Sequence, residues 1–218
     1  MNNTQGEIIY VLDALCGWCY GFTPAVTQFH HDVKGKVNFR LLHGGLWPGE
    51  RARPMDDSLV NHLSRGMPLV TRKTGQQFGD AFKKKIVEDA SFIYDTEPAA
   101  RAAVTARALS QETDACLEVA FVNKIQQAFF IEGRDINKRE TFVAIAESLG
   151  LDSEEFSALY ESKAMKASVV QQFTEARVLG VASFPTMLYK QGDLIEVLSG
   201  GVESLDNLHQ KFEALSST

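Results

Sequence analysis

Apolar residues near the N-terminus follow the pattern of a β-α-β unit. The β-rich run at 8–12 fits a buried strand and is too short for a core helix. Residues 16–32 predict a helix, in which Pro24 should cause a bend because proline cannot donate a backbone hydrogen bond. Residues 37–42 predict a second strand, which we expect to run parallel to the first.

The middle of the chain, from residue 48 to 180, has an almost wholly helical pattern. It predicts four to six helices, least clearly in 49–79. Pro98 precedes an alanine-rich stretch, 99–109, and proline is tolerated at a first helical position. We therefore expect a block of helices with no strand of its own.

The pattern returns to strands after Gly180. Residues 186–190 and 194–198 predict a hairpin, and an amphipathic helix follows at 202–215. The whole order is β-α-β, helices, then β-β-α. This order predicts an α/β, thioredoxin-like fold that carries a large all-helical insertion.

Two expected parts follow from this order. Residues 1–47 and 180–218 would form the thioredoxin-like domain, and residues 48–179 would form the helical insertion. The sequence leaves open whether the insertion forms a homodimer interface, a substrate lid or a cover for the site.

Composition limits the function classes. The chain has 218 residues, of which 44% are hydrophobic and 23% charged, so one soluble domain with a sizeable core is expected. The formal net charge of −6 argues against nucleic-acid or anionic-membrane partners. The N-terminal residues do not resemble a signal peptide, and no apolar stretch is long enough for a membrane span, so the expected location is cytoplasmic.

Cys16 and Cys19 are the residues closest to specifying a reaction. They lie where the first strand leads into a helix, and a helix N-terminus stabilises a thiolate. Positions three apart share one helix face, so the pair can form and break a disulfide. We expect Cys16 to attack and Cys19, deeper in the helix, to resolve the mixed disulfide.

The sequence around these cysteines resembles the DsbA-like thioredoxin superfamily, especially its FrnE-like branch. The similar segments are Cys16-Gly17-Trp18-Cys19-Tyr20-Gly21-Phe22, His43-Gly44-Gly45-Leu46, 129–136 and 180–186. The resemblance implies a thiol-disulfide oxidoreductase that acts on proteins with cysteines or on small thiols. We expect no metal and no tightly bound cofactor, and glutathione or another thiol is a candidate co-substrate.

The same resemblance implies roles for residues far along the chain. Pro185 would be the cis-proline that faces the dithiol, and Phe184 would present its backbone to an incoming peptide. Phe184 would form an apolar collar around the sulfurs together with Trp18 and Tyr20.

Two departures from better-known relatives affect the chemistry. Gly17 and Trp18 stand where DsbA proteins commonly have Pro-His, so no imidazole stabilises the thiolate and a less oxidising couple is expected. Tyr10 occupies the position of a buried acid and is a poor base at neutral pH. Asp13 is the other candidate for proton transfer, although aspartate at such a position more often serves a turn.

Other readings of the cysteines remain open at this point. The pair could be an inert disulfide or half a zinc site, although the histidines lack zinc-site spacing. Cys116 is expected to be a small buried hydrophobe.

We favour a reductase or isomerase. The alternatives are a glutathione-dependent isomerase or transferase of the kappa-like class, in which serine typically replaces the first cysteine, and a redox-responsive or metal-binding adaptor without enzymatic activity.

Overall fold

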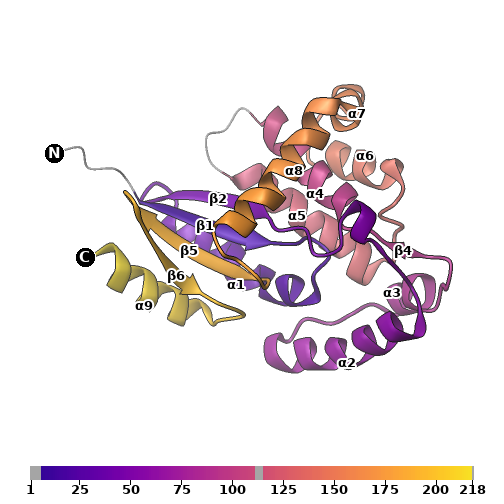
Figure 1. Cartoon of the computed structure of the whole chain (residues 1–218), viewed down its shortest axis with the longest axis horizontal. Coiled ribbons are helices and arrows are strands. Elements are labelled where there is room, and N and C mark those ends of the chain that lie inside the picture. The colour runs from indigo at the N-terminus through magenta and orange to yellow at the C-terminus, as the bar shows by residue number, and fades with distance from the viewer. Residues whose placement is uncertain (1–5, 111–114, 218) are drawn as a thin grey trace.

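A four-stranded sheet joins the two ends of the chain in the computed structural model, which describes residues 6–110 and 115–217 (Figure 1). The strands are β1 (Glu7–Leu12), β2 (Asn38–His43), β5 (Thr186–Gln191) and β6 (Leu194–Ser199), in the order β2-β1-β5-β6. β1 runs parallel to β2 and antiparallel to β5, and β5 and β6 form the expected hairpin. The expected thioredoxin-like α/β fold is confirmed.

The alternation of side chains along β1 explains why its sequence is apolar throughout. β1 is a central strand between β2 and β5, and each of its two faces packs into a buried core. Ile8 and Tyr10 point into the large core, whereas Ile9 and Val11 belong to a smaller core on the opposite face. A strand with only one buried face would show alternating polar residues instead.

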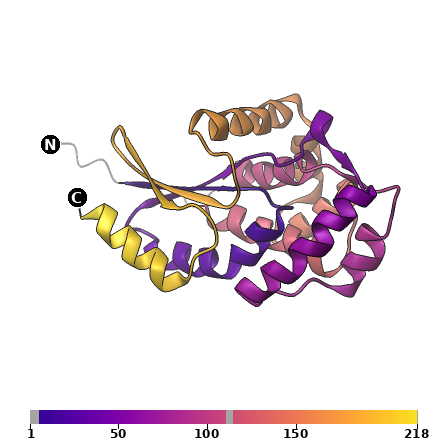
Figure 2. The same ribbon diagram turned by 60° about the horizontal axis from the view of Figure 1, so that its bottom comes forward.

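Helices cover both faces of the sheet (Figure 2). Helices α1 (Gly17–Val33) and α9 (Leu205–Ser216) lie side by side on one face, and α8 (Lys163–Val178) lies on the other, against β2. Helix α1 contains Pro24 within its length, as expected. Cys16 lies at the N-cap of α1, so the dithiol begins the helix.

The segment between β2 and α8 is mostly helical. Its α-helices are α2 (Asp57–Thr74), α3 (Asp80–Phe82), α4 (Glu97–Leu109), α5 (Cys116–Gln126), α6 (Arg139–Ser148) and α7 (Ser153–Glu161). Short π-helical segments, Lys83–Val87 and Gln127–Ile131, follow α3 and α5, and a 3₁₀ turn spans Gly49–Arg51. The strands in this segment are the two-residue pair β3 (Arg53–Pro54) and β4 (Ile93–Tyr94).

The region from 48 to 180 therefore holds more helices than the four to six expected, counting α2 to α8 among the described residues. Local capping separates two of these helices, α7 and α8. Asp152 accepts a hydrogen bond from the Glu155 N–H and starts α7, and Ser162 accepts one from the Met165 N–H and starts α8.

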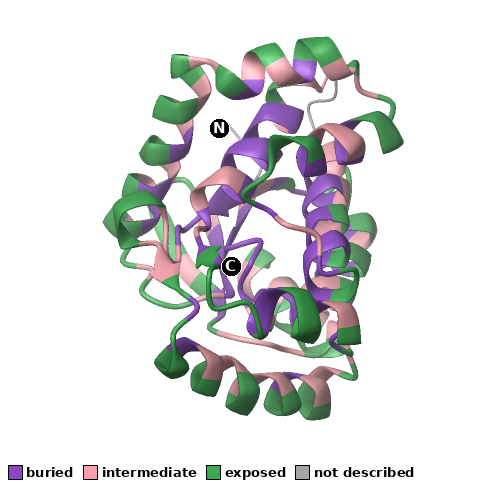
Figure 3. Ribbon diagram, turned by 90° about the vertical axis from the view of Figure 1, so that its right-hand side faces the viewer, coloured by how far each residue is buried: buried purple, intermediate pink, exposed green. Residues whose placement is uncertain are grey.

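The buried residues of the helical segment face inward toward one another and toward the sheet (Figure 3). Phe129 is fully buried and packs against Phe82 and Tyr94. These aromatic residues belong to the same large core as Ile8 and Tyr10 of β1. The helices are therefore packed onto the sheet by one continuous core. Within residues 6–110 and 115–217, no helix has the length and apolar character needed to cross a membrane.

Candidate active site

The dithiol is positioned by the turn between β1 and α1. Asp13 begins this turn and is buried. One of its carboxylate oxygens accepts the Leu15 N–H at 2.9 Å, and the other accepts the Leu46 N–H at 2.7 Å. The Cys16 N–H donates to the Asp13 carbonyl at 3.1 Å. One buried carboxylate thus fixes the turn that carries Cys16 and the loop that follows β2.

Asp13 accordingly occupies the position of a turn and loop acceptor. Burial raises its pKa, while the hydrogen bonds from Leu46 and Leu15 oppose that shift. Both oxygens already accept backbone hydrogen bonds, so the proton-transfer role considered for Asp13 stays a hypothesis with no geometric support beyond proximity to the thiols.

Cys16 and Cys19 are both thiols, and they differ in environment as expected. Cys16 keeps 7% of its surface exposed, whereas Cys19 is completely buried. The Cys19 thiol donates to the Cys16 sulfur and thereby lowers the pKa of Cys16, although burial opposes this; the N–H groups of Cys19 and Trp18 lower it further. Burial first, and then the Cys16 side chain, raise the pKa of Cys19 well above its usual value. The thiolate therefore forms on Cys16.

The Phe184–Pro185 loop faces Cys16 at the same end of the sheet, because β5 pairs directly with β1. The peptide bond between these residues is cis, and the Cys16 thiol donates to the Phe184 carbonyl at 3.7 Å. Thr186 follows as the first residue of β5, and its hydroxyl donates to the Ser183 carbonyl at 2.8 Å. The structure thus brings Cys16, Cys19, Phe184 and Pro185 together, although the sequence separates them by more than 160 residues.

Gly44 allows this loop to approach the end of β2. A Cβ atom at Gly44 would overlap the ring of Phe184, so only glycine leaves room for the ring. Gly44 is itself fixed, because its N–H donates to the Leu12 carbonyl at 2.8 Å. Gly44 therefore helps to set the position of the Phe184 carbonyl next to Cys16.

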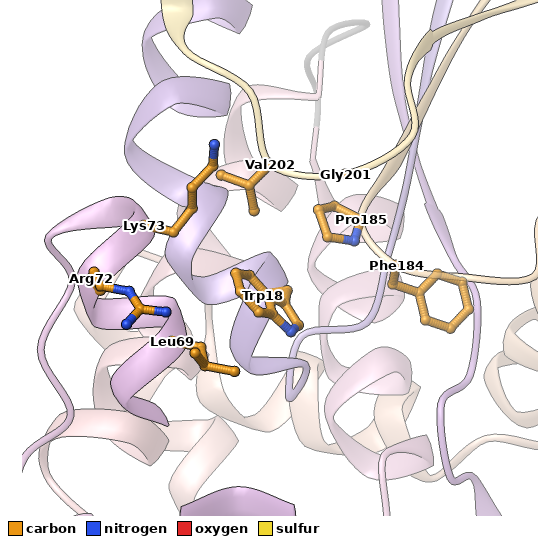
Figure 4. A pocket seen from close by; sticks show the side chains of 8 residues that line it. All are labelled: Trp18, Leu69, Arg72, Lys73, Phe184, Pro185, Gly201 and Val202. Atoms are coloured by element: carbon orange, nitrogen blue, oxygen red, sulfur yellow. The ribbon is translucent and has the colours of Figure 1, made fainter. Parts of the chain in front are cut away.

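A groove opens on one side of Trp18 and Phe184 (Figure 4). It has a volume of about 510 Å³. Trp18, Leu69, Arg72, Lys73, Phe184, Pro185, Gly201 and Val202 line it, and we call it the cationic groove. Arg72 forms no ion pair with a carboxylate of the described residues. The groove thus combines an aromatic wall with two positive charges from α2.

A second hollow, which we call the apolar cavity, opens on the other side of Trp18 and Phe184. Its volume is about 350 Å³ and Cys16 is part of its wall. Its other lining side chains are mostly apolar and include Leu46, Trp47, Met67, Phe78, Tyr94 and Phe130. The nucleophilic sulfur therefore borders the apolar cavity, and Trp18 and Phe184 line both this cavity and the cationic groove.

The expected apolar collar forms only in part. Trp18 is 37% exposed and lines both hollows together with Phe184. Tyr20 does not belong to the collar, so that expectation is wrong. Tyr20 is buried, its ring stacks on Phe130, and its hydroxyl donates to the Gln77 carbonyl at 2.6 Å. Packing of the helical segment onto α1 covers Tyr20, and the sequence pattern of α1 alone does not reveal that cover.

Tyr10 and Cys116, the other two residues considered from the sequence, have different surroundings. Tyr10 is buried within the core on β1, behind the dithiol. Cys116 is not the buried hydrophobe that we expected: it begins α5, is only partly buried, and its sulfur accepts a hydrogen bond from the Lys34 ammonium at 3.1 Å. The sulfur lies near the surface, where the exposed Lys34 side chain reaches it.

Sequence reasoning missed Arg72 and Lys73. Both lie in the last turn of α2, just before the left-handed C-cap Gly75. Basic residues at a helix C-terminus are common and usually balance the helix dipole, so their sequence position carried no functional signal. Only the packing of α2 beside α1 places them next to Trp18.

The site combines a dithiol at a helix N-terminus with a cis-proline that faces it at the same end of a thioredoxin-type sheet. This combination defines the class of thioredoxin-like thiol oxidoreductase folds. The sequence matches the DSBA-like thioredoxin domain over residues 7–213, so the chain belongs to this family. No curated protein matches the sequence.

Solved structures show the same architecture. The cytosolic disulfide reductase DsbM from Pseudomonas aeruginosa is 27% identical, with a TM-score of 0.81 over 97% of this chain and 98% of that one. Its structure with GSH is 28% identical, with a TM-score of 0.79 over 97% and 100% of the two chains. A Nitrosomonas europaea protein, provisionally assigned as a protein disulfide isomerase, is 22% identical, with a TM-score of 0.87 over 98% of both chains.

The asymmetry of the two thiols predicts their reactivity. In a Cys116→Ser background, the rate of Cys16 alkylation by iodoacetamide should be measured against pH. Its midpoint should fall below pH ~8.5, the pKa of an ordinary thiol, because the pKa of Cys16 is lowered. Cys19 should react only at higher pH, since its pKa is raised. Cys19→Ala should move the Cys16 midpoint upward, because it removes the thiol donor. An unchanged midpoint in Cys19→Ala would contradict this account.

The close approach at Gly44 predicts a second effect. Gly44→Ala should destabilise the protein by about 1–3 kcal/mol in urea unfolding, because the new methyl group forces the Phe184 ring to move. It should also slow disulfide exchange at Cys16, because the Phe184 carbonyl moves with the ring. Gly200→Ala is the matched control, since no atom lies within 4 Å of a Cβ there. Equal stability and exchange rates for the two variants would refute the positioning role of Gly44.

Proposed function

We propose that this protein is a cytosolic thiol-disulfide reductase that uses Cys16 and Cys19, and that glutathione reduces its Cys16–Cys19 disulfide after each turnover. The observation that carries the proposal is the difference between the two thiols. The pKa of Cys16 is lowered in the wall of the apolar cavity, and the pKa of the fully buried Cys19 is raised. A partly accessible thiolate with a buried partner suits attack followed by resolution.

The reaction runs in two exchanges. The Cys16 thiolate attacks a substrate disulfide, a bond forms between Cys16 and one substrate sulfur, and the other substrate sulfur leaves as a thiolate. Cys19 then loses its proton and attacks the Cys16 sulfur, which forms the Cys16–Cys19 disulfide and releases the reduced substrate. The two electrons gained by the substrate come from the dithiol.

Reduction of the Cys16–Cys19 disulfide back to the dithiol requires two molecules of glutathione. The first glutathione thiolate attacks Cys16, breaks the Cys16–Cys19 bond and leaves glutathione attached to Cys16. The second attacks that mixed disulfide and leaves as oxidised glutathione, which restores both thiols. A reducing compartment favours this direction, and the expected cytoplasmic location is part of the proposal.

The cationic groove supports glutathione as the co-substrate. Glutathione carries carboxylates at both ends, and Arg72 and Lys73 supply positive charge in a groove that borders Trp18 and Pro185. In this orientation the backbone of Phe184 would pair with the peptide, as an added strand does. The likeness to DsbM, whose structure was solved with GSH, agrees with this assignment.

Substitution of the cysteines tests the reaction. Cys16→Ser should abolish insulin reduction by glutathione, whereas Cys19→Ser should retain attack and accumulate glutathione on Cys16, visible by intact-protein mass spectrometry. Cys116→Ser is the control and should keep the activity of the parent protein, because Cys116 contacts Lys34 and lines neither hollow. Insulin reduction by the Cys16→Ser variant at the rate of the parent protein would contradict the proposal.

The cationic groove predicts a binding effect. Arg72→Gln and Lys73→Gln should each raise the KM for glutathione about two- to fivefold with little change in kcat, because exposed charge pairs contribute up to about 1 kcal/mol. Lys84→Gln is the control, because Lys84 is exposed and lies outside the groove. If all three variants have the parent KM, glutathione does not use this groove.

The apolar cavity favours a second candidate, a glutathione-dependent isomerase or transferase acting on an apolar small molecule. A cavity of about 350 Å³ that includes Cys16 in its wall could hold such a substrate next to a bound thiol. A 2-hydroxychromene-2-carboxylate isomerase shares the fold, at 17% identity and a TM-score of 0.61. Glutathione-dependent turnover of an aromatic substrate that survives Cys16→Ser would favour this candidate over the reductase.

A further inference from the structure

A tyrosine of the helical segment reaches the turn that carries the nucleophile. Tyr94 belongs to β4 and is buried, and its hydroxyl donates to the Leu15 carbonyl at 2.6 Å, although 79 residues separate the two in the chain. Leu15 directly precedes Cys16, and Tyr94 and Cys16 both line the apolar cavity. The helical segment therefore contacts the peptide unit that leads into the dithiol.

This hydrogen bond holds one end of the peptide unit between Leu15 and Cys16. The other end is held as well, because the Cys16 N–H donates to the Asp13 carbonyl at 3.1 Å. A peptide unit is planar and rigid, so two hydrogen bonds at opposite ends fix its orientation. That orientation determines where the Cys16 side chain starts, and its thiol reaches the Phe184 carbonyl at 3.7 Å.

Tyr94 is itself firmly placed. Its ring packs edge-on against the rings of Trp47 and Phe129, with centroids 5.2 and 5.3 Å away. The neighbouring Thr96 exchanges two hydrogen bonds with Trp47. The Trp47 N–H donates to the Thr96 hydroxyl at 3.2 Å, and the Thr96 N–H donates to the Trp47 carbonyl at 3.1 Å.

These contacts close a ring around the active-site turn. Asp13 accepts the Leu46 N–H at 2.7 Å, Leu46 is followed by Trp47, and Trp47 is bonded to Thr96. The ring returns to the turn through the hydroxyl of Tyr94. We call it the brace; its members are Asp13, Leu15, Leu46, Trp47, Tyr94 and Thr96.

The hydroxyl of Tyr94 suits this task because it remains a donor. Burial first, and then the charges of Asp13 and Cys16, raise the pKa of Tyr94 well above its usual value, so the hydroxyl stays protonated when Cys16 is a thiolate. A buried carbonyl that loses its donor is costly, so without this hydroxyl the peptide unit would turn toward another donor.

We propose that Tyr94 is a positioning residue for the dithiol: through the Leu15 carbonyl, the brace holds the Cys16 sulfur at the start of α1 and beside the Phe184 carbonyl. The inference rests on the dithiol chemistry proposed above. It gives residues 48–179 a part in that chemistry beyond covering the sheet, because Tyr94 and Thr96 both belong to this segment.

The pH profile of Cys16 alkylation tests the proposal. In a Cys116→Ser background, Tyr94→Phe keeps the ring and removes the hydroxyl, and mass spectrometry of the Cys16 peptide follows its reaction with iodoacetamide. The midpoint should rise, because the sulfur moves away from the N–H groups that stabilise its anion. The rate at neutral pH should fall about tenfold, since a small displacement of a reacting group commonly costs that much or more. A role in stability alone would leave the midpoint unchanged.

Tyr160→Phe is the matched control, because Tyr160 is a buried tyrosine of α7 that lines neither hollow. It should keep the midpoint and the rate of the parent protein. Urea unfolding of each variant establishes that it folds. Folded Tyr94→Phe with the parent midpoint and rate, or with the same change as Tyr160→Phe, overturns the proposal.

A pair of variants at Thr96 tests the brace from its other side. Thr96→Val removes the hydroxyl that accepts the Trp47 N–H, whereas Thr96→Ser keeps a hydroxyl there. Thr96→Val should raise the Cys16 midpoint, and Thr96→Ser should leave it at the parent value. Equal midpoints for these two variants would contradict the brace.

Alkylation needs only the Cys16 thiol, so these results do not depend on glutathione or on any protein substrate. If glutathione fails to reduce the Cys16–Cys19 disulfide, the proposed function fails and the effect of Tyr94→Phe stands. If Tyr94→Phe has no effect on Cys16, the positioning role fails and the assignment as a reductase stands.

Discussion

The register of β1 between its two neighbours is the constraint on which the site depends. β1 pairs Leu12 with His43 of β2 and Val11 with Thr186 of β5. The residues that follow or precede these pairs are Cys16, Gly44 and Pro185, so one edge of the sheet gathers them from three separate segments. A shift of one residue in either pairing would turn alternate side chains to the opposite face and separate the dithiol from the Phe184 carbonyl.

The site stabilises a thiolate without a cationic side chain. The groups that favour the Cys16 anion are the Cys19 thiol and the N–H groups of Cys19 and Trp18, all of which are neutral donors. Their effect is opposed by burial and by the negative charge of Asp13. This balance fits the less oxidising couple expected from the absence of an imidazole between the cysteines, because a weakly stabilised thiolate gives a weaker oxidant.

The helices between β2 and β5 do more than cover the sheet. Helix α2 brings Arg72 and Lys73 to the open side of Trp18, and α5 brings the Gln126 side chain to the Thr23 hydroxyl of α1. The same insertion also buries Tyr20, which removes that residue from the substrate surface.

The sequence by itself determined the features that depend on local pattern. The apolar run of β1, the dithiol at the start of α1 and the hairpin of β5 and β6 each follow from residues close together in the chain, because hydrophobic period and turn chemistry act over a few positions. Resemblance to a known family added the cis bond before Pro185, and the structure has it.

Only the tertiary structure decided the contacts between distant segments. Asp13 accepts the Leu46 N–H, Phe184 packs on Gly44, and Arg72 lies beside Trp18 because of how loops and helices pack. The burial of Tyr20 and the partial exposure of Cys116 were missed for the same reason. Local periodicity gives the face of a helix that is buried, but the packing of whole elements determines which residue that face meets.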